Sequence, residues 1–335
     1  MSAPGRRSLW QRLFGRSPAP LASPVVRRVT HAPVAMHWKP GARLPVPDWD
    51  VMAAHLPDTA DDAQADGYFT TAAGQWLDAL ADALPDAYVI RTTDDFMLLS
   101  AQPERAATLT LRSCTQALRA IRASLGPLAC DTGHGPHVVL VFVTRDAYED
   151  YLAQYYGDDD DPPISSGVFI NAGYGHFASA HDALDDLEAV VVHELTHALL
   201  AHLPLPVWLN EGIAVNTERG LLPRLADPRL ALYGPDEMAG RHAAWWDART
   251  IQAFWSGDVF AEAGEGVELA YDLARMITAL AARDAPAFRA FVAQAHRGDA
   301  GSDAAQDALG YPLAHLVEAV LGDGDWTPQP GRVAA

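Results

Sequence analysis

The chain has 335 residues, of which 49% are hydrophobic and 20% charged, and its formal net charge is −19. This composition indicates a folded protein with a substantial buried core. It excludes a disulfide scaffold and a four-cysteine zinc site, since Cys114 and Cys130 are the only cysteines, and no apolar run reaches the roughly 18–20 residues of a membrane span.

Charge is distributed unevenly along the chain. Residues 1–47 contain eight basic residues and no acidic residue, whereas the remainder carries a net charge of −27. An acidic body repels phosphate, so nucleic acid is not an expected partner. The basic, proline-rich segment is interpreted as a disordered leader. Weak contact with an anionic membrane, with an acidic partner, or with its own acidic body as an inhibitory segment is the alternative.

The first residues do not read as a secretory signal. Arginines interrupt the apolar residues Leu9, Trp10, Leu13 and Phe14, so no continuous apolar region forms. A cytoplasmic location is therefore expected.

Hydrophobic periodicity predicts the elements that follow the leader. An amphipathic helix is expected around 76–84, ended by Pro85, and short strands at 88–90 and 96–99 come next. The remaining expected elements are, in chain order, a helix over 109–125, a buried strand over 138–143, a helix over 148–155, a solvated acidic loop at 158–161, a strand over 167–172, a helix from 182 to about 202, a second helix opening at Pro206, and helices over 266–283, 286–297 and 312–321.

These elements divide the chain into a leader (1–47), one domain (48–325) and a tail (326–335). Within the domain, an α/β part covers about 74–203 and a helical part covers about 204–325. Because the strands come early and the helices late, we expect an α+β fold with segregated layers, and not alternating βαβ units.

The segment 190–200 carries the strongest chemical signal. In a helix, His193 and His197 lie one turn apart on the same face, where both imidazoles can reach one zinc ion. Glu194 points beside the metal, where its carboxylate can take a proton from a water molecule. The alternative is a pair of histidines on a core helix with a surface glutamate.

The next segment strengthens the metal interpretation. Pro206 suits the first turn of a second helix, and Glu211, thirteen residues beyond His197, is well placed as an oxygen ligand. Two histidines and one glutamate leave a fourth position open, as in catalytic zinc sites. Gly212 would let the two helices approach closely.

The motifs His-Glu-Leu-Thr-His-Ala (193–198) and Trp-Leu-Asn-Glu-Gly-Ile-Ala (208–214) resemble the gluzincin zinc metallopeptidases, in particular the bacterial peptidase-MA-like proteins. The specific resemblance covers about 186–217, and a looser one in element order covers about 85–322. It implies a zincin-like fold, in which the edge strand of a small mixed sheet lies over the active-site helix and a mainly helical part follows.

The resemblance also assigns roles to residues. It implies one zinc ion per chain on His193, His197 and Glu211, with Glu194 as the general base in the hydrolysis of a peptide or protein substrate. Tyr271 is the best match to the tyrosine that stabilises the oxyanion in gluzincins, with a core tyrosine as the alternative.

The strand at 167–172 would be the edge on which an extended peptide pairs. Asn171 and Ala172 resemble the pair that holds the substrate backbone in thermolysin-like enzymes. No glutamate stands in 164–181 to hold a free amino terminus, so an endopeptidase is favoured.

One position departs from the family pattern. Gluzincins commonly carry an acidic residue four positions after the third ligand, where this chain has Val215, and Asn216 is the candidate substitute. Loss of such a partner typically lowers metal affinity or activity 10–100-fold. The alternative function is therefore a catalytically weak or inactive zinc-binding scaffold that recruits a partner or membrane through residues 1–47.

Other histidines and aromatic residues carry weaker signals. His176 and His181 are expected in the loop that enters the zinc helix, and His202 at the end of that helix. The aromatic residues between 245 and 255 are interpreted as core, with a substrate pocket as the alternative.

Overall fold

The computed structural model describes residues 33–57, 59–131, 133–155, 167–180, 184–222, 224 and 232–329, with the backbone alone for 184–186. These residues form two compact units. The sheet unit holds the described residues up to Arg119 and from Asp131 to Ala198, and the helical unit holds Ala120–Cys130 and the described residues from Leu199 onward. The expected acidic loop at 158–161, His181 and the leader before residue 33 lie outside the described residues.

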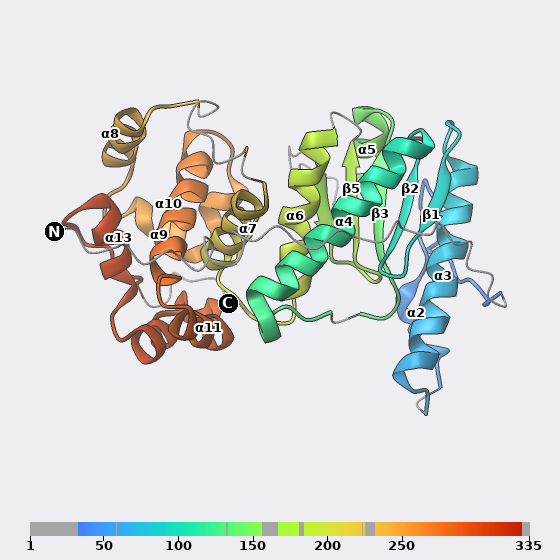
Figure 1. The fold of residues 1–335 in the computed structure, drawn as a ribbon, viewed down its shortest axis with the longest axis horizontal. Coiled ribbons are helices and arrows are strands. Elements are labelled where there is room, and N and C mark those ends of the chain that lie inside the picture. The colour runs from blue at the N-terminus through green and yellow to red at the C-terminus, as the bar shows by residue number, and fades with distance from the viewer. Residues whose placement is uncertain are drawn as a thin grey trace. The chain divides into compact units, whose positions relative to one another are not determined.

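The sheet unit is built on a five-stranded mixed sheet (Figure 1). Its order is β1 (Val89–Thr92), β2 (Phe96–Ser100), β3 (His137–Phe142), β5 (His176–Ala180) and β4 (Gly167–Ile170). The β2–β3 and β3–β5 pairs are parallel, whereas β1 and β4 pair antiparallel at the two edges. Helix α4 (Glu104–Leu125) connects β2 to its parallel partner β3, and the chain passes through β4 between the parallel strands β3 and β5. The sequence analysis did not expect these parallel crossovers. The α+β class is confirmed, and strand 167–172 is an edge strand that ends at Ile170.

Strand β5 was not expected from the sequence. Its residues His176, Ala178, Ser179 and Ala180 have little apolar bulk or β propensity, and the segment was interpreted as a loop. All five residues of β5 are buried because the strand lies inside the sheet, between β3 and β4. Tertiary position, which local sequence does not encode, therefore determines this strand.

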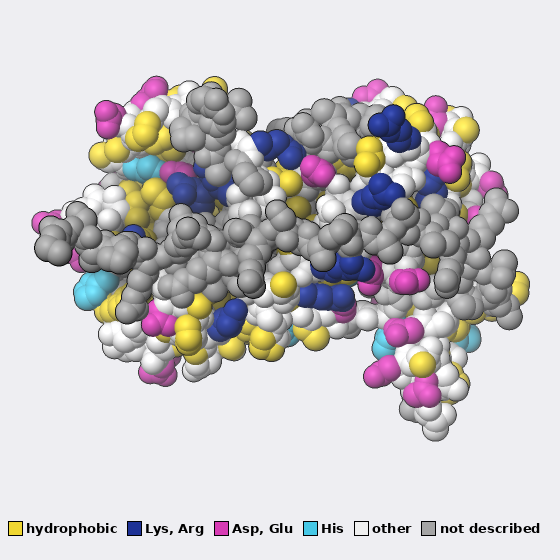
Figure 2. Space-filling model, in the orientation of Figure 1, with side chains coloured by type: hydrophobic (Ala, Val, Ile, Leu, Met, Phe, Trp, Pro, Cys, Tyr) yellow, Lys and Arg dark blue, Asp and Glu magenta, His cyan; other side chains and the backbone are white. Residues whose placement is uncertain are grey.

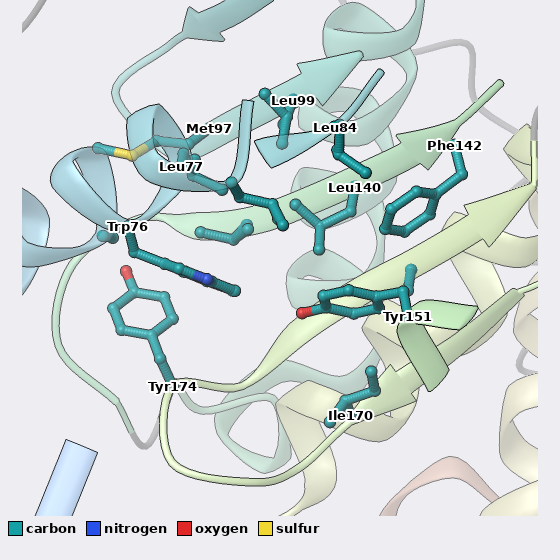
Figure 3. Packing of buried hydrophobic residues seen from close by; sticks show 14 of the residues in the cluster. Trp76, Leu77, Leu84, Met97, Leu99, Leu140, Phe142, Tyr151, Ile170 and Tyr174 are labelled. Atoms are coloured by element: carbon teal, nitrogen blue, oxygen red, sulfur yellow. The ribbon is translucent and has the colours of Figure 1, made fainter. Parts of the chain in front are cut away.

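Helices α3 (Asp62–Ala83) and α5 (Arg145–Leu152) supply side chains to one core (Figure 3). Trp76 and Leu77 of α3 pack with strand residues that include Leu99 and Leu140. Tyr151 of α5 lies beside Phe142, with 5.0 Å between the ring centroids. Every residue of β2 is buried, which requires cover on both faces of the sheet, since successive side chains alternate between the faces.

Helix α3 begins fourteen residues before its expected start at 76. Its first half is rich in alanine, threonine and glycine, so hydrophobic periodicity does not reveal it. A capping box stabilises the start, with Asp61 accepting from the backbone N–H of Gln64 and the Gln64 side chain accepting from the N–H of Asp61. Acidic side chains gather there (lower right in Figure 2), where they complement the helix dipole.

The segment 33–47, assigned to the leader by sequence, takes part in the fold. The side-chain amide of Gln75 accepts from the N–H of Val34 at 2.8 Å and donates to its carbonyl at 3.0 Å. The indole of Trp76 donates to the carbonyl of Pro45, and Val46 is 5% exposed. Helix α2 (Trp49–Ala54) follows directly. The apolar residues among the prolines therefore belong to the core of the sheet unit.

The helical unit consists of helices and short helical turns among its described residues. Its helices are α7 (Val207–Leu221), α8 (Pro235–Trp245), α9 (Thr250–Ser256), α10 (Glu265–Ala281), α11 (Ala285–Gln294), α12 (Ser302–Ala304) and α13 (Leu313–Leu321), with short turns at η1 (Gly126–Leu128), η4 (Asp258–Ala261), η5 (Arg297–Asp299) and η6 (Ala305–Leu309). The expected helices at 266–283, 286–297 and 312–321 are confirmed.

The start of the expected tail is ordered on helix α9. Trp326 is 7% exposed, and its carbonyl accepts from the indole N–H of Trp255 at 2.9 Å. The side chain of Gln252 donates to the carbonyl of Thr327 and accepts from the N–H of Gln329. Trp246, Phe254 and Trp255 are buried, so these aromatic residues serve the core of this unit.

No described helix combines the length and the apolar character needed to cross a membrane.

A buried histidine forms part of the core beside Trp76. His176, expected in a loop, is fully buried on β5. Because the carbonyl of Tyr174 can only accept, Nδ1 of His176 carries the hydrogen of their 2.8 Å bond, and Nε2 accepts from the hydroxyl of Tyr151 at 2.6 Å. Burial lowers the pKa of His176 to about 4, against an ordinary value of 6.5. The imidazole is therefore a neutral core residue.

Protonation of His176 should couple stability to pH. Its pKa is lower in the folded than in the unfolded state, so its contribution is complete above about pH 6.5 and falls as the pH drops toward 4. We expect the free energy of unfolding to fall by about 2 kcal/mol more in the wild type than in His176→Gln between about pH 7 and pH 5. Urea titration at the two pH values measures this, and equal losses would contradict it.

Candidate metal centre

Helix α6 (Leu184–Leu200) presents the ionisable residues of the motif as a stripe, within an arc of about 100° around its axis. Between Val191 and Leu200, every residue is buried except His193, Glu194 and His197, which are half-buried. The buried side chains anchor the helix by the apolar face that its sequence predicts. His193, Glu194 and His197 are therefore partly accessible, as the roles expected for them require.

The two histidines lie together, as their spacing predicts. The ring centroids of His193 and His197 are 4.8 Å apart, with the ring planes at 78° to each other. One turn of helix separates the two residues, so both imidazoles leave the helix on the same side.

Glu194 contacts the edge strand of the sheet. Its Oε2 accepts a hydrogen bond from the backbone N–H of Phe169, with 2.9 Å between nitrogen and oxygen. Phe169 lies on β4, whereas Asn171 and Ala172, expected to hold substrate, follow the end of that strand and are exposed. The sequence did not indicate Phe169, because its backbone N–H and not its side chain makes the contact.

Glu211 lies on α7 and is half-buried. Among the described residues, His193, His197 and Glu211 are those whose donor atoms could together hold a metal ion. Two imidazole nitrogens and one carboxylate oxygen are a donor set that suits zinc and leaves a fourth position open.

Helix α7 is fixed by its packing on α10. A Cβ atom on Gly212 would lie 2.2 Å from Oγ1 of Thr278 and 2.6 Å from the carbonyl oxygen of Ala274, both on α10. Gly212 thus allows a close approach of α7 to α10 within the helical unit. Glu211 and Gly212 point about 100° apart around the helix, so each has its own neighbours.

Val215 stands where gluzincins commonly carry an acidic residue, and its side chain is half-buried. The buried side chain of Asn216 donates to the carbonyl of Gly212 at 2.7 Å and to that of Arg275 at 2.9 Å. The second bond ties α7 to α10. Asn216 therefore has a packing role in the helical unit.

Tyr271 lies on α10 and is half-buried, with its ring edge-on to Phe260 at a centroid distance of 5.3 Å. The adjacent Asp272 accepts hydrogen bonds from His242 at 3.1 Å and from Arg275 at 2.6 Å. Burial raises the pKa of Asp272, but His242 and Arg275 outweigh this and bring it to about 2. Asp272 is therefore an ionised carboxylate that links α10 to His242 of α8. The oxyanion role of Tyr271 stays a prediction.

His202 is exposed in the turn after α6, as expected.

Comparison of the chain with protein-family models, with curated proteins and with solved structures finds no match. The function of the chain is therefore inferred from its motif and from the geometry of its described residues.

The contact of Gly212 with α10 should limit substitution. We expect Gly212→Ala to lower the free energy of unfolding by about 1–3 kcal/mol, because the added methyl group meets backbone as well as side chain on α10. Gly240→Ala on α8 is the matched control, since its Cβ would meet no atom within 4 Å, and it should stabilise by up to about 1 kcal/mol. Denaturant unfolding compares the two, and equal effects would show that the contact is not tight.

Proposed function

We propose that the protein is a zinc-dependent peptidase of gluzincin type, in which His193, His197 and Glu211 hold one zinc ion. The observation that carries the proposal is the composition of the half-buried stripe on α6. Between Val191 and Leu200, the residues that are not buried are His193, His197 and Glu194, which is the proposed general base. The spacing places both imidazoles on one side of the helix, where both could bind one zinc ion.

The donor set supports a catalytic rather than a structural metal. A bound zinc ion would supply a Lewis acid that polarises a peptide carbonyl and acidifies water. His193 and His197 would bind through ring nitrogens, and Glu211 would add the charge that strengthens the site.

Glu194 would act as the general base. Its carboxylate would take a proton from the attacking water and later give it to the leaving amine. The hydroxyl of Tyr271 would donate a hydrogen bond to the oxyanion. A peptide chain would bind extended along the edge of β4, with Asn171 and Ala172 as candidate contacts and internal peptide bonds as the favoured targets.

A second candidate function is a zinc-binding scaffold with little or no activity. Val215 favours it, because an apolar residue stands where gluzincins commonly carry an acidic one. In this case the metal would stabilise the fold, and residues 1–47 would recruit a partner or a membrane. A scaffold does not need Glu194, which favours the peptidase.

Glu194→Gln separates the two candidates. We expect this variant to retain zinc, because Glu194 is not a ligand, and to lose peptide hydrolysis by at least about 100-fold. Glu149→Gln, an exposed glutamate on α5, is the matched control and should keep full activity. Zinc content and hydrolysis of an unfolded protein substrate are measured on the same preparations.

Full activity of Glu194→Gln would remove this residue from the chemistry. A wild-type protein that binds zinc and hydrolyses no substrate would favour the scaffold.

A further inference from the structure

The antiparallel pairing of β4 with β5 determines which backbone groups of the edge strand point outward. In such a ladder, residues that exchange hydrogen bonds with the neighbouring strand alternate with residues that point their N–H and C=O away from it. The register places Val168 opposite Ala178 and Phe169 opposite Phe177. Since the N–H of Phe169 donates to Glu194, Phe169 is one of the outward-pointing residues.

Phe169 is held firmly on the sheet. Its ring packs against Phe177, with 5.0 Å between the ring centroids. It also covers Gly175, where an added Cβ would lie 2.7 Å from Cζ of Phe169. The N–H of Phe169 therefore projects from a backbone position fixed by strand pairing and by packing of the ring.

The bond between Phe169 and Glu194 joins this fixed donor to an ionisable acceptor. At 2.9 Å it has the geometry of a good hydrogen bond, and bonds to ionised carboxylates are stronger than neutral ones. It restricts the rotamers of Glu194 through a donor that cannot itself rotate. A carboxylate offers about four lone-pair positions, so acceptance from Phe169 is compatible with proton transfer from water.

We propose that Phe169 is a positioning residue, whose backbone N–H holds the carboxylate of Glu194 in the orientation that general-base catalysis requires. The catalytic part of this inference rests on the proposed peptidase function, whereas the contact itself does not. A rigid scaffold that positions a reacting group in advance reduces the reorganisation needed during the reaction.

Two substitutions of Phe169 separate its backbone from its ring. Phe169→Pro removes the N–H, and proline is tolerated on an edge strand where that N–H does not bond to the neighbouring strand. Phe169→Ala keeps the N–H and loses the ring. A difference between the two variants therefore reports on the hydrogen bond.

The first readout is amide hydrogen exchange in protein labelled with ¹⁵N at its ten phenylalanines, without added metal. The resonance absent from Phe169→Ala identifies Phe169. We expect its exchange to be at least about tenfold faster in Glu194→Ala than in the wild type, the factor that loss of a hydrogen bond to a charged group gives. The amide of Phe177 should not change. Equal exchange of Phe169 in both proteins would overturn the proposal.

The second readout is catalysis. We expect Phe169→Pro to keep its zinc and its KM within a few-fold, and to lose kcat by at least about tenfold relative to Phe169→Ala. Equal kcat values, or loss of zinc by the proline variant, would show a structural role only and overturn the proposal.

A wild-type protein that hydrolyses no peptide would overturn the proposed function and the positioning role together. In that event, the exchange experiment still decides whether Phe169 holds Glu194. The two failures are therefore distinguishable.

Discussion

The site depends on the burial of helix α6. Seven of the ten residues from Val191 to Leu200 are buried, and this packing fixes the direction in which the other three project. His193 and His197 share a side of the helix because of its 3.6-residue period, and Glu194 lies beside them for the same reason. A helix packed less completely would leave the two imidazoles free to rotate with it.

Each unit adds a constraint of its own. In the sheet unit, edge strand β4 brings a backbone donor to Glu194, so the position of this carboxylate depends on strand pairing. In the helical unit, α7 is pressed against α10 at Gly212 and tied to it by Asn216, which fixes the helix that carries Glu211. Within each unit, these contacts fix the carboxylate of Glu194 and the backbone of α7.

The sequence predicts the motif helices well because their signals are local. The spacing of His193 and His197 and the helix after Pro206 follow from periodicity and helix-start rules. Strand β5 could not be predicted in this way, because small residues form it and only its place inside the sheet buries them. The hydrogen bond from Phe169 to Glu194 also escaped prediction, since the backbone makes it, and the prolines of segment 33–47 concealed its packing.

The central proposal is that His193 and His197 of α6, together with Glu211, bind one zinc ion. The most direct test is elemental analysis of the purified full chain after incubation with zinc and dialysis, for the wild type, His197→Ala and His202→Ala. The account predicts about one zinc ion per chain in the wild type and in His202→Ala, whose exposed histidine lies beyond the helix, and none in His197→Ala. Absence of zinc from the wild type, or its retention by His197→Ala, would contradict the account.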